Sequence, residues 1–420
     1  MLGTKSIWEE LAAIVGQANL RVATQEDAVC GVIPQFVAEP ENEQQLAAVL
    51  SSANAAGIAV IPRGGGTKMA WGNPPKRAEL ILSTARLNRI VEHAWADLTV
   101  TVEAGCTLQA LQATLGKHGQ RLAFDGLWPE SATIGGALST NDSGALRLRF
   151  GAFRDLIIGV TLALPDGTLA SSGGKVVKNV AGYDLPKLAT GALGTLGVIA
   201  RAVFRLHPLP HKVKSLSFSV DSLHDMQSHI LAIQDSKLAH TALQVRCAAV
   251  DVPRADILFE STDAGLRAQE LHLRDLLASS DLQPSPENAW NARQDLFNSP
   301  ADHVVLAKIS LLPADFANVV ESLSVAGNAH KVHWQEVLQA TGVGILRLEG
   351  EPAGLSATVQ HLRSTLERLG GSLILLRRPK ELLALDSWGD PGDALTLMRA
   401  VKNRLDPNNT LNPGRFVGGI

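Results

Sequence analysis

The chain has few cysteines, and their arrangement excludes one class of cofactor. Cys30, Cys106 and Cys247 are its three cysteines, and no two of them have the C-x-x-C spacing. Iron–sulfur clusters typically take about four closely spaced thiolates. The sequence therefore excludes a bound iron–sulfur cluster, and we expect three reduced thiols in a cytosolic protein.

Long hydrophobic runs are also missing. No apolar stretch reaches the roughly 18 residues that a membrane-spanning helix requires. Glu9 and Glu10 interrupt the N-terminus where a signal peptide has its apolar core. The formal net charge of −3 gives no electrostatic case for nucleic acid or an anionic membrane. We expect a cytoplasmic protein that meets the inner face of the cell membrane only through partners.

Two common nucleotide-binding motifs are absent as well. The dinucleotide fingerprint G-x-G-x-x-G finds its nearest match at Gly191, Gly194 and Gly197, where the spacing is wrong. The P-loop requires a lysine directly after its second glycine, whereas Lys68 follows Gly66-Thr67. The sequence therefore argues against an ATPase and against a doubly wound dehydrogenase.

Glycine, by contrast, is abundant and clustered. The segment Pro-Arg-Gly-Gly-Gly-Thr (62–67) follows the apolar run 58–61. Consecutive glycines let backbone N–H groups turn inward, and without Cβ atoms a diphosphate can approach closely. Two further glycine-rich segments span 133–144 and 191–199. The pattern predicts a phosphate-binding loop. The alternative for 63–67 is a tight turn without a ligand, and the alternative for 133–144 is a strand and loop in which glycines have no binding role.

The order of these segments carries a family resemblance. Residues 62–67, 101–105, 133–136, 140–141, 165–167, 194–197 and 405–414 resemble the FAD-binding domain of the p-cresol methylhydroxylase/vanillyl-alcohol oxidase superfamily. Residues 175–185, which lead into 191–197, are most similar to the FAD-binding E subunits of bacterial glycolate oxidases. The resemblance is strong over about 30–208, good over the last 20 or so residues and poor between them.

The resemblance implies an α+β fold in three parts. A p-cresol methylhydroxylase-type FAD-binding domain of two α+β subdomains is expected over 1–208, and an α+β cap domain, for substrate or partner contact, over 209–400. A tail at 401–420 is expected to return to the flavin. Prolines at 208 and 210 also favour a boundary there.

The periodicity predicts individual elements. We expect a helix from about residue 41 to Gly57, a helix over 107–118 capped by Thr107, and a buried strand over 156–164. Strands are also predicted at 58–61, 79–83, 89–92, 98–102, 199–206, 213–220, 242–245, 257–260, 344–348 and 372–376. The polar, proline-bearing stretch 280–300 is predicted to be a long loop.

The resemblance also implies which residues bind FAD. Thr67 stands where covalent flavoproteins of the family often have a histidine, so non-covalent FAD is expected; Ser143 stands where relatives often have glycine. The alternative for Asn412 is a turn that closes the chain. The expected FAD-binding residues are Arg63, Gly64, Gly65, Gly66, Thr67, Pro129, Thr133, Ile134, Gly135, Gly136, Ser139, Asn141, Gly144, Gly194, Gly197, Val198, Ile199 and Asn412.

Catalytic residues are not identified by the sequence. A 2-hydroxy acid needs a cation for its carboxylate and a base for its hydroxyl. Arg246, Arg347, Arg377 and Arg378 are the candidate cations, with ion-paired surface residues as the alternative. The family's Gly-Asp-Gly-Asn-x-His segment, which supplies a base, is absent.

Five other residues have both a functional and a structural interpretation. His330 and His333 have a spacing that clasps a metal if helical, but no third ligand accompanies them, so no metal is expected. Tyr183, the single tyrosine, either lines the flavin pocket or packs on a helix, and the second is expected. Lys178 and Asn179 either contact FAD or lie in a solvent-exposed loop without a binding role.

Three functions are compatible with these features. The leading hypothesis is an FAD-binding subunit of a glycolate oxidase complex, with a second FAD-containing subunit and an iron–sulfur subunit as partners. The alternatives are a self-sufficient FAD-dependent dehydrogenase of D-2-hydroxy acids and a flavin-free structural subunit. Intact glycine loops argue against the last, because glycines without a ligand to accommodate only weaken a fold.

Overall fold

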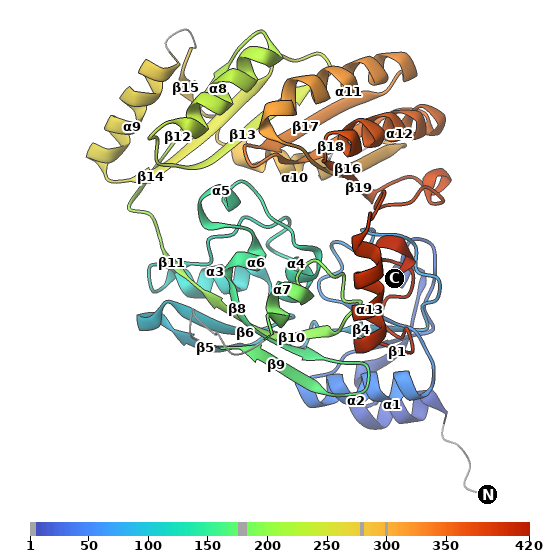
Figure 1. The fold of residues 1–420 in the computed structure, drawn as a ribbon. Coiled ribbons are helices and arrows are strands. Elements are labelled where there is room, and N and C mark those ends of the chain that lie inside the picture. Colours follow the sequence, from blue (N-terminus) through green and yellow to red (C-terminus); the bar gives the residue numbers. More distant parts are fainter. Residues whose placement is uncertain (1–5, 175–182, 278–280, 299–300) are drawn as a thin grey trace, which may run out of the picture. The chain divides into compact units, whose positions relative to one another are not determined.

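The computed structural model describes residues 6–174, 183–277, 281–298 and 301–420 (Figure 1). They form two compact units. Unit 1 comprises 1–143, 151–209 and 391–420, and unit 2 comprises 144–150 and 210–390. The chain thus leaves unit 1 twice, over the short segment 144–150 and again from 210 to 390. None of the described helices is long and apolar enough to cross a bilayer.

The first sheet of unit 1 presents the glycine loop at the end of one strand. Its order is β1–β2–β4–β3, and β4 pairs in parallel with both β2 and β3. The strands are β1 (Leu20–Val22), β2 (Phe36–Ala38), β3 (Val60–Arg63) and β4 (Leu80–Ser83). Helices α1 (Ile7–Val15) and α2 (Glu43–Ala55) pack against each other. Leu46, Val49 and Leu50 of α2 are buried beside this sheet, so the helical spacing is confirmed.

The second sheet of unit 1 is antiparallel, with the order β5–β6–β10–β8–β9. Its strands are β5 (Ile90–Ala94), β6 (Thr99–Glu103), β8 (Ile157–Ala163), β9 (Leu169–Gly173) and β10 (Val198–Arg205). β7 (Gln120–Arg121) and β11 (His207–Pro208) form a separate short pair. The remaining helices of this unit are α3 (Leu108–Gly116), α4 (Ile134–Thr140), α6 (Phe153–Leu156), α7 (Leu185–Ala189) and α13 (Ala394–Leu405). Thr107 caps α3 as predicted, because its hydroxyl accepts the Ala110 N–H at 3.2 Å.

Unit 2 is built on one antiparallel sheet of the order β15–β12–β14–β13–β17–β18–β16–β19. Its strands are β12 (Lys212–Ser219), β13 (His240–Ala248), β14 (Arg254–Ser261), β15 (Gln283–Pro284), β16 (Val304–Ser310), β17 (His333–Gln339), β18 (Val343–Glu349) and β19 (Ser372–Arg377). Its helices are α5 (Arg147–Phe150), α8 (Leu223–Asp235), α9 (Asp263–Leu276), α10 (Ala292–Asn298), α11 (Phe316–His330) and α12 (Pro352–Arg368). Helices α8, α9, α11 and α12 cover one face of the sheet, and α10 lies against the other (Figure 1).

Short 3₁₀ helices complete the two units. They are η1 (Gln17–Asn19), η2 (Gln25–Asp27), η3 (Trp95–Asp97), η4 (Ala289–Asn291), η5 (Pro313–Asp315), η6 (Lys380–Leu382) and η7 (Val417–Gly419). The prediction of a long loop over 280–300 is wrong, because β15, η4 and α10 lie there. Leu296 and Phe297 of α10 are buried, and this packing outweighs the polar composition of the stretch.

Candidate functional site

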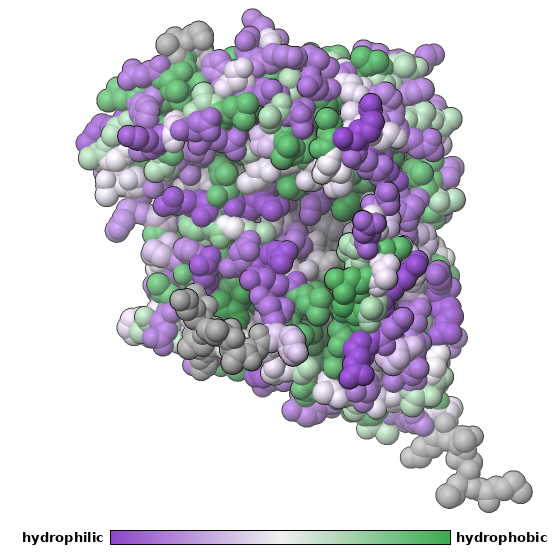
Figure 2. Space-filling view, in the orientation of Figure 1, coloured by the Kyte–Doolittle hydropathy of each residue, from purple (hydrophilic) through white to green (hydrophobic). Residues whose placement is uncertain are grey.

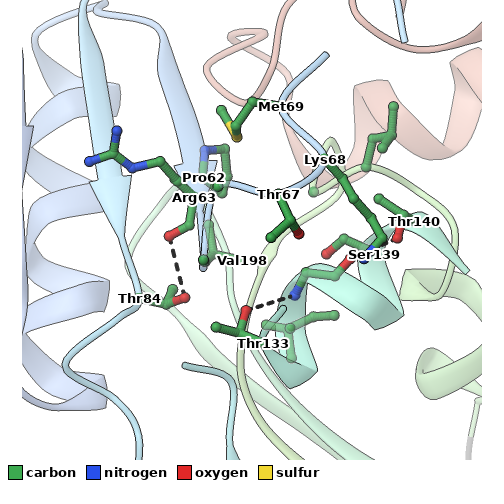
Figure 3. Close-up of a pocket in the computed structure, with 18 of the residues that line it drawn as sticks. Pro62, Arg63, Thr67, Lys68, Met69, Thr84, Thr133, Ser139, Thr140 and Val198 are labelled. Atoms are coloured by element: carbon green, nitrogen blue, oxygen red, sulfur yellow. Dashed lines mark hydrogen bonds between the residues drawn. The ribbon is translucent and has the colours of Figure 1, made fainter. Parts of the chain in front are cut away.

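A pocket of unit 1 lies where β3, α4, β10 and the C-terminal tail meet (Figure 3). All three glycine-rich segments contribute to it, together with Asn412. Its lining comprises Pro62, Arg63, Gly64, Gly65, Gly66, Thr67, Lys68, Met69, Thr84, Thr133, Gly135, Gly136, Ser139, Thr140, Leu193, Gly194, Val198, Ile199, Asn412 and Arg415. Segments that are far apart in the sequence thus form one cavity.

The loop after β3 offers a row of backbone donors. Within the described parts of the chain, the N–H groups of Gly64, Gly65, Gly66 and Thr67 have no intramolecular hydrogen-bond partner. Gly65 and Gly66 are exposed, and Gly66 has a φ of +75°, a conformation that L side chains rarely adopt. Successive amide donors at such a turn form an anion-binding concavity. This donor set fits a diphosphate.

Two of these glycines also face the chain itself. A Cβ on Gly64 would overlap the hydroxyl of Thr133, and a Cβ on Gly65 would overlap the Ser131 carbonyl oxygen. Neither glycine has a positive φ. The requirement for glycine here therefore comes first from close packing against the segment before α4, and not only from the approach of a phosphate.

The second glycine-rich segment is a helix rather than a loop. Thr133 caps α4, and its hydroxyl accepts the Gly136 N–H at 3.3 Å. The Ile134 and Gly135 N–H groups donate to the Cys106 and Ala104 carbonyls at 2.9 and 2.8 Å. The first amides of α4 are thus satisfied within the chain. Ser139 and Thr140 provide hydroxyl groups at the pocket wall, further along the helix (Figure 3).

The C-terminal tail extends the first sheet at its β3 edge. The Val60 N–H donates to the Thr410 carbonyl at 2.7 Å, and the Asn412 N–H donates to the Val60 carbonyl at 2.9 Å. Asn412 has a φ of 46°, and its side-chain Nδ2 donates to the Leu193 carbonyl. Asn412 therefore ties the tail to the loop before β10.

A buried lysine holds the tail in this position. The Lys402 ammonium on α13 donates to the Thr195 and Leu411 carbonyls, each at 2.9 Å, and pairs with the Asp406 carboxylate at 2.6 Å. Asp406 also accepts the Leu411 N–H at 2.8 Å. Burial lowers the pKa of Lys402 despite the nearby carboxylate. This cluster joins α13, the tail and the loop before β10.

The cationic side chains at the pocket are engaged with the protein. Arg63 donates to Asp27 at 2.7 Å, and its side chain points away from Thr133 (Figure 3). A hydrogen bond from Arg21 is the largest cause that holds the pKa of Asp27 well below its usual range. Lys68 lies 3.4 Å from the Asp142 carboxylate. Arg415 donates to the Met69 and Trp71 carbonyls at 2.6 and 2.8 Å, and burial lowers its pKa.

Some expected FAD contacts do not line the pocket. Pro129, Ile134, Asn141 and Gly197 lie outside its lining, and Gly144 belongs to unit 2. Ser143, the least typical position of the motif, is likewise not among the lining residues, and its hydroxyl accepts the Phe153 N–H at 3.3 Å. These residues shape the chain around the pocket instead.

Other lining residues were missed from the sequence. They are Pro62, Lys68, Met69, Thr84, Thr140, Leu193 and Arg415. Pro62, Thr140 and Leu193 lie inside the recognised segments, and Lys68, Met69 and Arg415 follow such segments closely, so neighbourhood in the chain was the available signal. Thr84 is different: its N–H donates to the Arg63 carbonyl at 2.8 Å, because β4 pairs with β3 in parallel and both strands end at the same edge.

The candidate arginines of unit 2 are all held by partners. Arg246 forms two hydrogen bonds to Asp256, at 2.7 and 2.9 Å. Arg347 and Arg377 donate to the carbonyls at the end of α10, at 2.8 and 3.3 Å. Arg378 donates to the Ser387 hydroxyl at 2.6 Å. Their positions are explained by the packing of unit 2, and the catalytic residues stay unassigned.

The other open candidates have no common site. His330 ends α11 and His333 begins β17, so the helical spacing required for a shared metal is not realised. Tyr183 is 91% exposed, and the expectation that it packs on a helix is wrong. Lys178 and Asn179 lie outside the described residues.

Comparisons with known proteins match two parts of the chain to families of FAD-linked proteins. Residues 34–173 match the FAD binding domain family, and 388–416 match the C-terminal domain of FAD linked oxidases. The chain is 33% identical over 222 residues to glycolate oxidase subunit GlcD of Bacillus subtilis, a match that covers 51% of this chain and 47% of the relative. It is 27% identical over 427 residues to a D-2-hydroxyglutarate dehydrogenase of Xanthomonas citri pv. viticola, with coverage of 91% and 89%.

The fold is shared with a solved structure. The structure of p-cresol methylhydroxylase with substrate bound superposes with a TM-score of 0.80 at 15% identity, and the match covers 97% of this chain and 96% of the other. The predicted α+β fold of the p-cresol methylhydroxylase type is confirmed. The family matches and the donor row of residues 64–67 agree that the cofactor is FAD.

Proposed function

We propose that this FAD-dependent oxidoreductase oxidises the hydroxyl-bearing carbon of a 2-hydroxy acid. The observation that carries the assignment of its cofactor site is the row of amide donors at Gly64, Gly65, Gly66 and Thr67, which lines the pocket between the three glycine-rich segments. The names of two relatives, a glycolate oxidase subunit and a D-2-hydroxyglutarate dehydrogenase, support the substrate class.

The chain's own residues would bind and orient the cofactor. FAD, when bound, supplies the flavin ring that accepts a hydride from the substrate carbon. The amides of 64–67 would hold the diphosphate, and each hydrogen bond to a charged acceptor contributes about 1.5–3 kcal/mol. Val198 and Ile199 of β10 give the pocket an apolar wall. Thr67 has no imidazole that could form a covalent bond to the flavin, so FAD would be bound non-covalently.

The finer proposal is an FAD-binding subunit of a glycolate oxidase complex. Glycolate would lose two electrons and two protons to become glyoxylate, and the electrons would pass to a second FAD-containing subunit and an iron–sulfur subunit. Three features support this proposal: the resemblance over 175–197, the missing Gly-Asp-Gly-Asn-x-His segment and the lack of clustered cysteines. Each of them suggests that partners supply what this chain does not carry.

A second candidate has a specific observation in its favour. The similarity to a D-2-hydroxyglutarate dehydrogenase spans 91% of the chain, whereas the similarity to the glycolate oxidase subunit spans 51%. A self-sufficient dehydrogenase of D-2-hydroxy acids would therefore share its organisation with a relative along almost the whole length. The missing histidine segment is the evidence against it.

Anaerobic reduction of the bound flavin tests the proposal. The isolated chain and the co-expressed complex are mixed in turn with glycolate, D-lactate and D-2-hydroxyglutarate, and loss of the oxidised flavin absorbance is followed. We expect glycolate to bleach the flavin of the complex. Bleaching of the isolated chain by D-lactate or D-2-hydroxyglutarate would favour the second candidate. A flavin that stays oxidised with all three acids in both preparations would contradict 2-hydroxy acid oxidation.

A further inference from the structure

An apolar groove lies on unit 1, separate from the FAD pocket. It runs between α13, the segment after α7 and the end of the C-terminal tail. Ala192, Leu196, Leu397, Met398, Val401 and Phe416 form most of its surface, which encloses about 250 Å³. The groove therefore combines a hollow shape with apolar walls, as sites for apolar side chains do.

Helix α13 exposes hydrophobic side chains of the kind that a surface helix usually buries. Leu397 is 69% exposed and Met398 is 36% exposed, whereas the buried residue of this helix is Lys402. Hydrophobic residues gather over α13 on the surface shown in Figure 2. A surface helix normally turns its apolar stripe to the core, and a contiguous apolar patch marks a site of interaction. The exposed stripe of α13 lies along the groove.

The charges beside the groove are mainly basic. Helix α13 contains Arg399, Lys402 and Arg404 and no acidic residue, although Asp393 precedes it. Arg399 donates to the Gly418 carbonyl at 3.1 Å, which places its guanidinium beside the tail. Arg404 follows Val401 by three residues and so lies on the same side of the helix.

Next to the groove on its other side, Lys187 is paired with Asp184 at 2.9 Å and adds little net charge. The groove therefore has apolar walls, and the helix that borders it carries net positive charge.

We propose that this groove binds an amphipathic helix of a partner protein whose apolar stripe is flanked by acidic residues. Such a helix would place leucine-like side chains in the hollow and carboxylates beside Arg399 and Arg404. A second copy of the chain fits less well, because a two-fold contact sets the same patch against itself and opposes like charges. A membrane surface fits less well because a hollow presents no continuous apolar face to lipid. The inference does not depend on which acid the enzyme oxidises.

A synthetic helical peptide with a leucine stripe flanked by glutamates is the probe, and the same peptide with lysines in place of the glutamates is its counterpart. Binding to the FAD-loaded chain is measured by fluorescence anisotropy. We expect the glutamate peptide to bind at least about tenfold more tightly than the lysine peptide. The variant Leu397→Glu should lose at least about tenfold in affinity for it, and Arg404→Glu should lose affinity as well.

The matched control is Leu271→Glu, which changes a leucine that is 63% exposed on α9 of unit 2. It should bind the peptide like the wild type, and all variants should retain their FAD, which shows that they fold. Equal binding of both peptides, or no effect of Leu397→Glu, would overturn the proposal. So would Leu397-dependent self-association in sedimentation, or Leu397-dependent binding to phosphatidylglycerol vesicles, which would assign the groove to a second copy or to lipid.

Discussion

Gly65 is constrained from two sides, by the ligand and by the chain. Its N–H group belongs to the donor row of the loop, and its Cα packs against the Ser131 carbonyl. The sequence suggested a collision between a larger residue and the phosphate. The structure shows an earlier collision inside the protein, which changes what a substitution should do.

We predict that Gly65→Val destabilises the apoprotein and weakens FAD binding together. The side chain must displace the Ser131 carbonyl, and overpacking of this kind costs about 1–3 kcal/mol. Thermal unfolding of the apoprotein and FAD titration measure the two effects. Gly116→Ala is the matched control, because Gly116 lies on α3 outside the pocket lining and a Cβ there would meet nothing within 4 Å. Wild-type stability and FAD affinity in Gly65→Val would contradict this account of the loop.

Thr67 leads to a prediction about the cofactor linkage. Its hydroxyl side chain offers no nitrogen nucleophile for a flavin bond, so denaturation should release all of the FAD into solution. Acid precipitation followed by absorbance of the supernatant and the pellet checks this. Yellow colour that remains with the precipitated protein would show a covalent bond elsewhere in the chain.

Glu336 is a carboxyl group in an apolar setting. It is 2% exposed on β17, and neither carboxyl oxygen has a hydrogen-bond partner within the described chain. Burial raises its pKa from 4.5 to about 8. The folded state therefore keeps a proton that the unfolded state releases, and its contribution to stability is complete below pH 4.5 and falls as the pH rises toward 8.

We predict that Glu336→Gln removes this loss. At about pH 8 the variant should be more stable than the wild type by about 1–3 kcal/mol, and near pH 5 the two should differ little. Denaturant unfolding at several pH values measures the difference. We expect the free energy of unfolding to fall less steeply with rising pH in the variant than in the wild type. Parallel curves for the two proteins would refute the prediction.

At the scale of elements, the C-terminal tail depends on one buried ion pair. Lys402 and Asp406 connect α13 to the Thr195 and Leu411 carbonyls, and Asn412 follows directly in the tail. Removing one member of a buried pair leaves an uncompensated charge, which costs about 3–5 kcal/mol. The stability of this element and the position of Asn412 should therefore change together.

We predict that Lys402→Met lowers both the thermal stability and the affinity for FAD. Asp406 loses its counter-ion, the two carbonyls lose their donor, and the tail is released from the loop before β10. Arg404→Ala, two residues away and exposed, is the control and should stay within about 0.5 kcal/mol of the wild type. If Lys402→Met were destabilised but bound FAD with unchanged affinity, the prediction that the tail contributes to FAD binding would be wrong.

Some elements could be predicted from the sequence and others could not. Strands with continuous apolar runs and turn residues at their ends were predicted well, as β8 and β10 show. β16 and β17 were missed; in β17, polar residues such as Gln335 and Gln339 alternate with the residues of the core face, so burial is a property of the assembled sheet. α4 was read as a loop because its two glycines disfavour a helix, and the Thr133 cap and the contacts of Gly135 with Ala104 stabilise it instead.

The parts of the site that could be predicted are those whose residues are close together in the sequence. The glycine loop and Asn412 were found because their motifs are compact in the sequence. Thr84 and Arg415 were missed because their place at the pocket depends on parallel pairing of β3 with β4 and on the returning tail. Pro129 and Asn141 were included from the resemblance, although their side chains lie outside the lining.

At the scale of the whole molecule, the central question is whether this chain oxidises its substrate alone or together with partners. The described residues contain no group of three or more His, Cys, Asp or Glu side chains that could hold a metal ion. The arginines of unit 2 that were candidates for the substrate carboxylate are bound to Asp256, to the end of α10 and to Ser387.

We predict that the isolated chain oxidises glycolate at a rate at least about a hundredfold lower than that of the co-expressed complex. The reason is that the chain lacks the family's histidine segment, and a positioned base alone contributes about 10²–10⁴ in rate. Steady-state oxidation with an artificial dye is the measurement. A dye takes electrons directly from an exposed flavin, so the lack of a cluster does not limit the assay. Comparable rates for both preparations would favour the self-sufficient dehydrogenase.

The return of the tail to β3 has a consequence for synthesis of the protein. Val60 exchanges hydrogen bonds with Thr410 and Asn412, residues some 350 positions later in the chain. During translation, the glycine loop leaves the ribosome long before the residues that complete its sheet edge. The nascent chain therefore has no finished cofactor pocket until residues 410–412 have emerged, so flavin can be bound only after all the segments between β3 and these residues have been made.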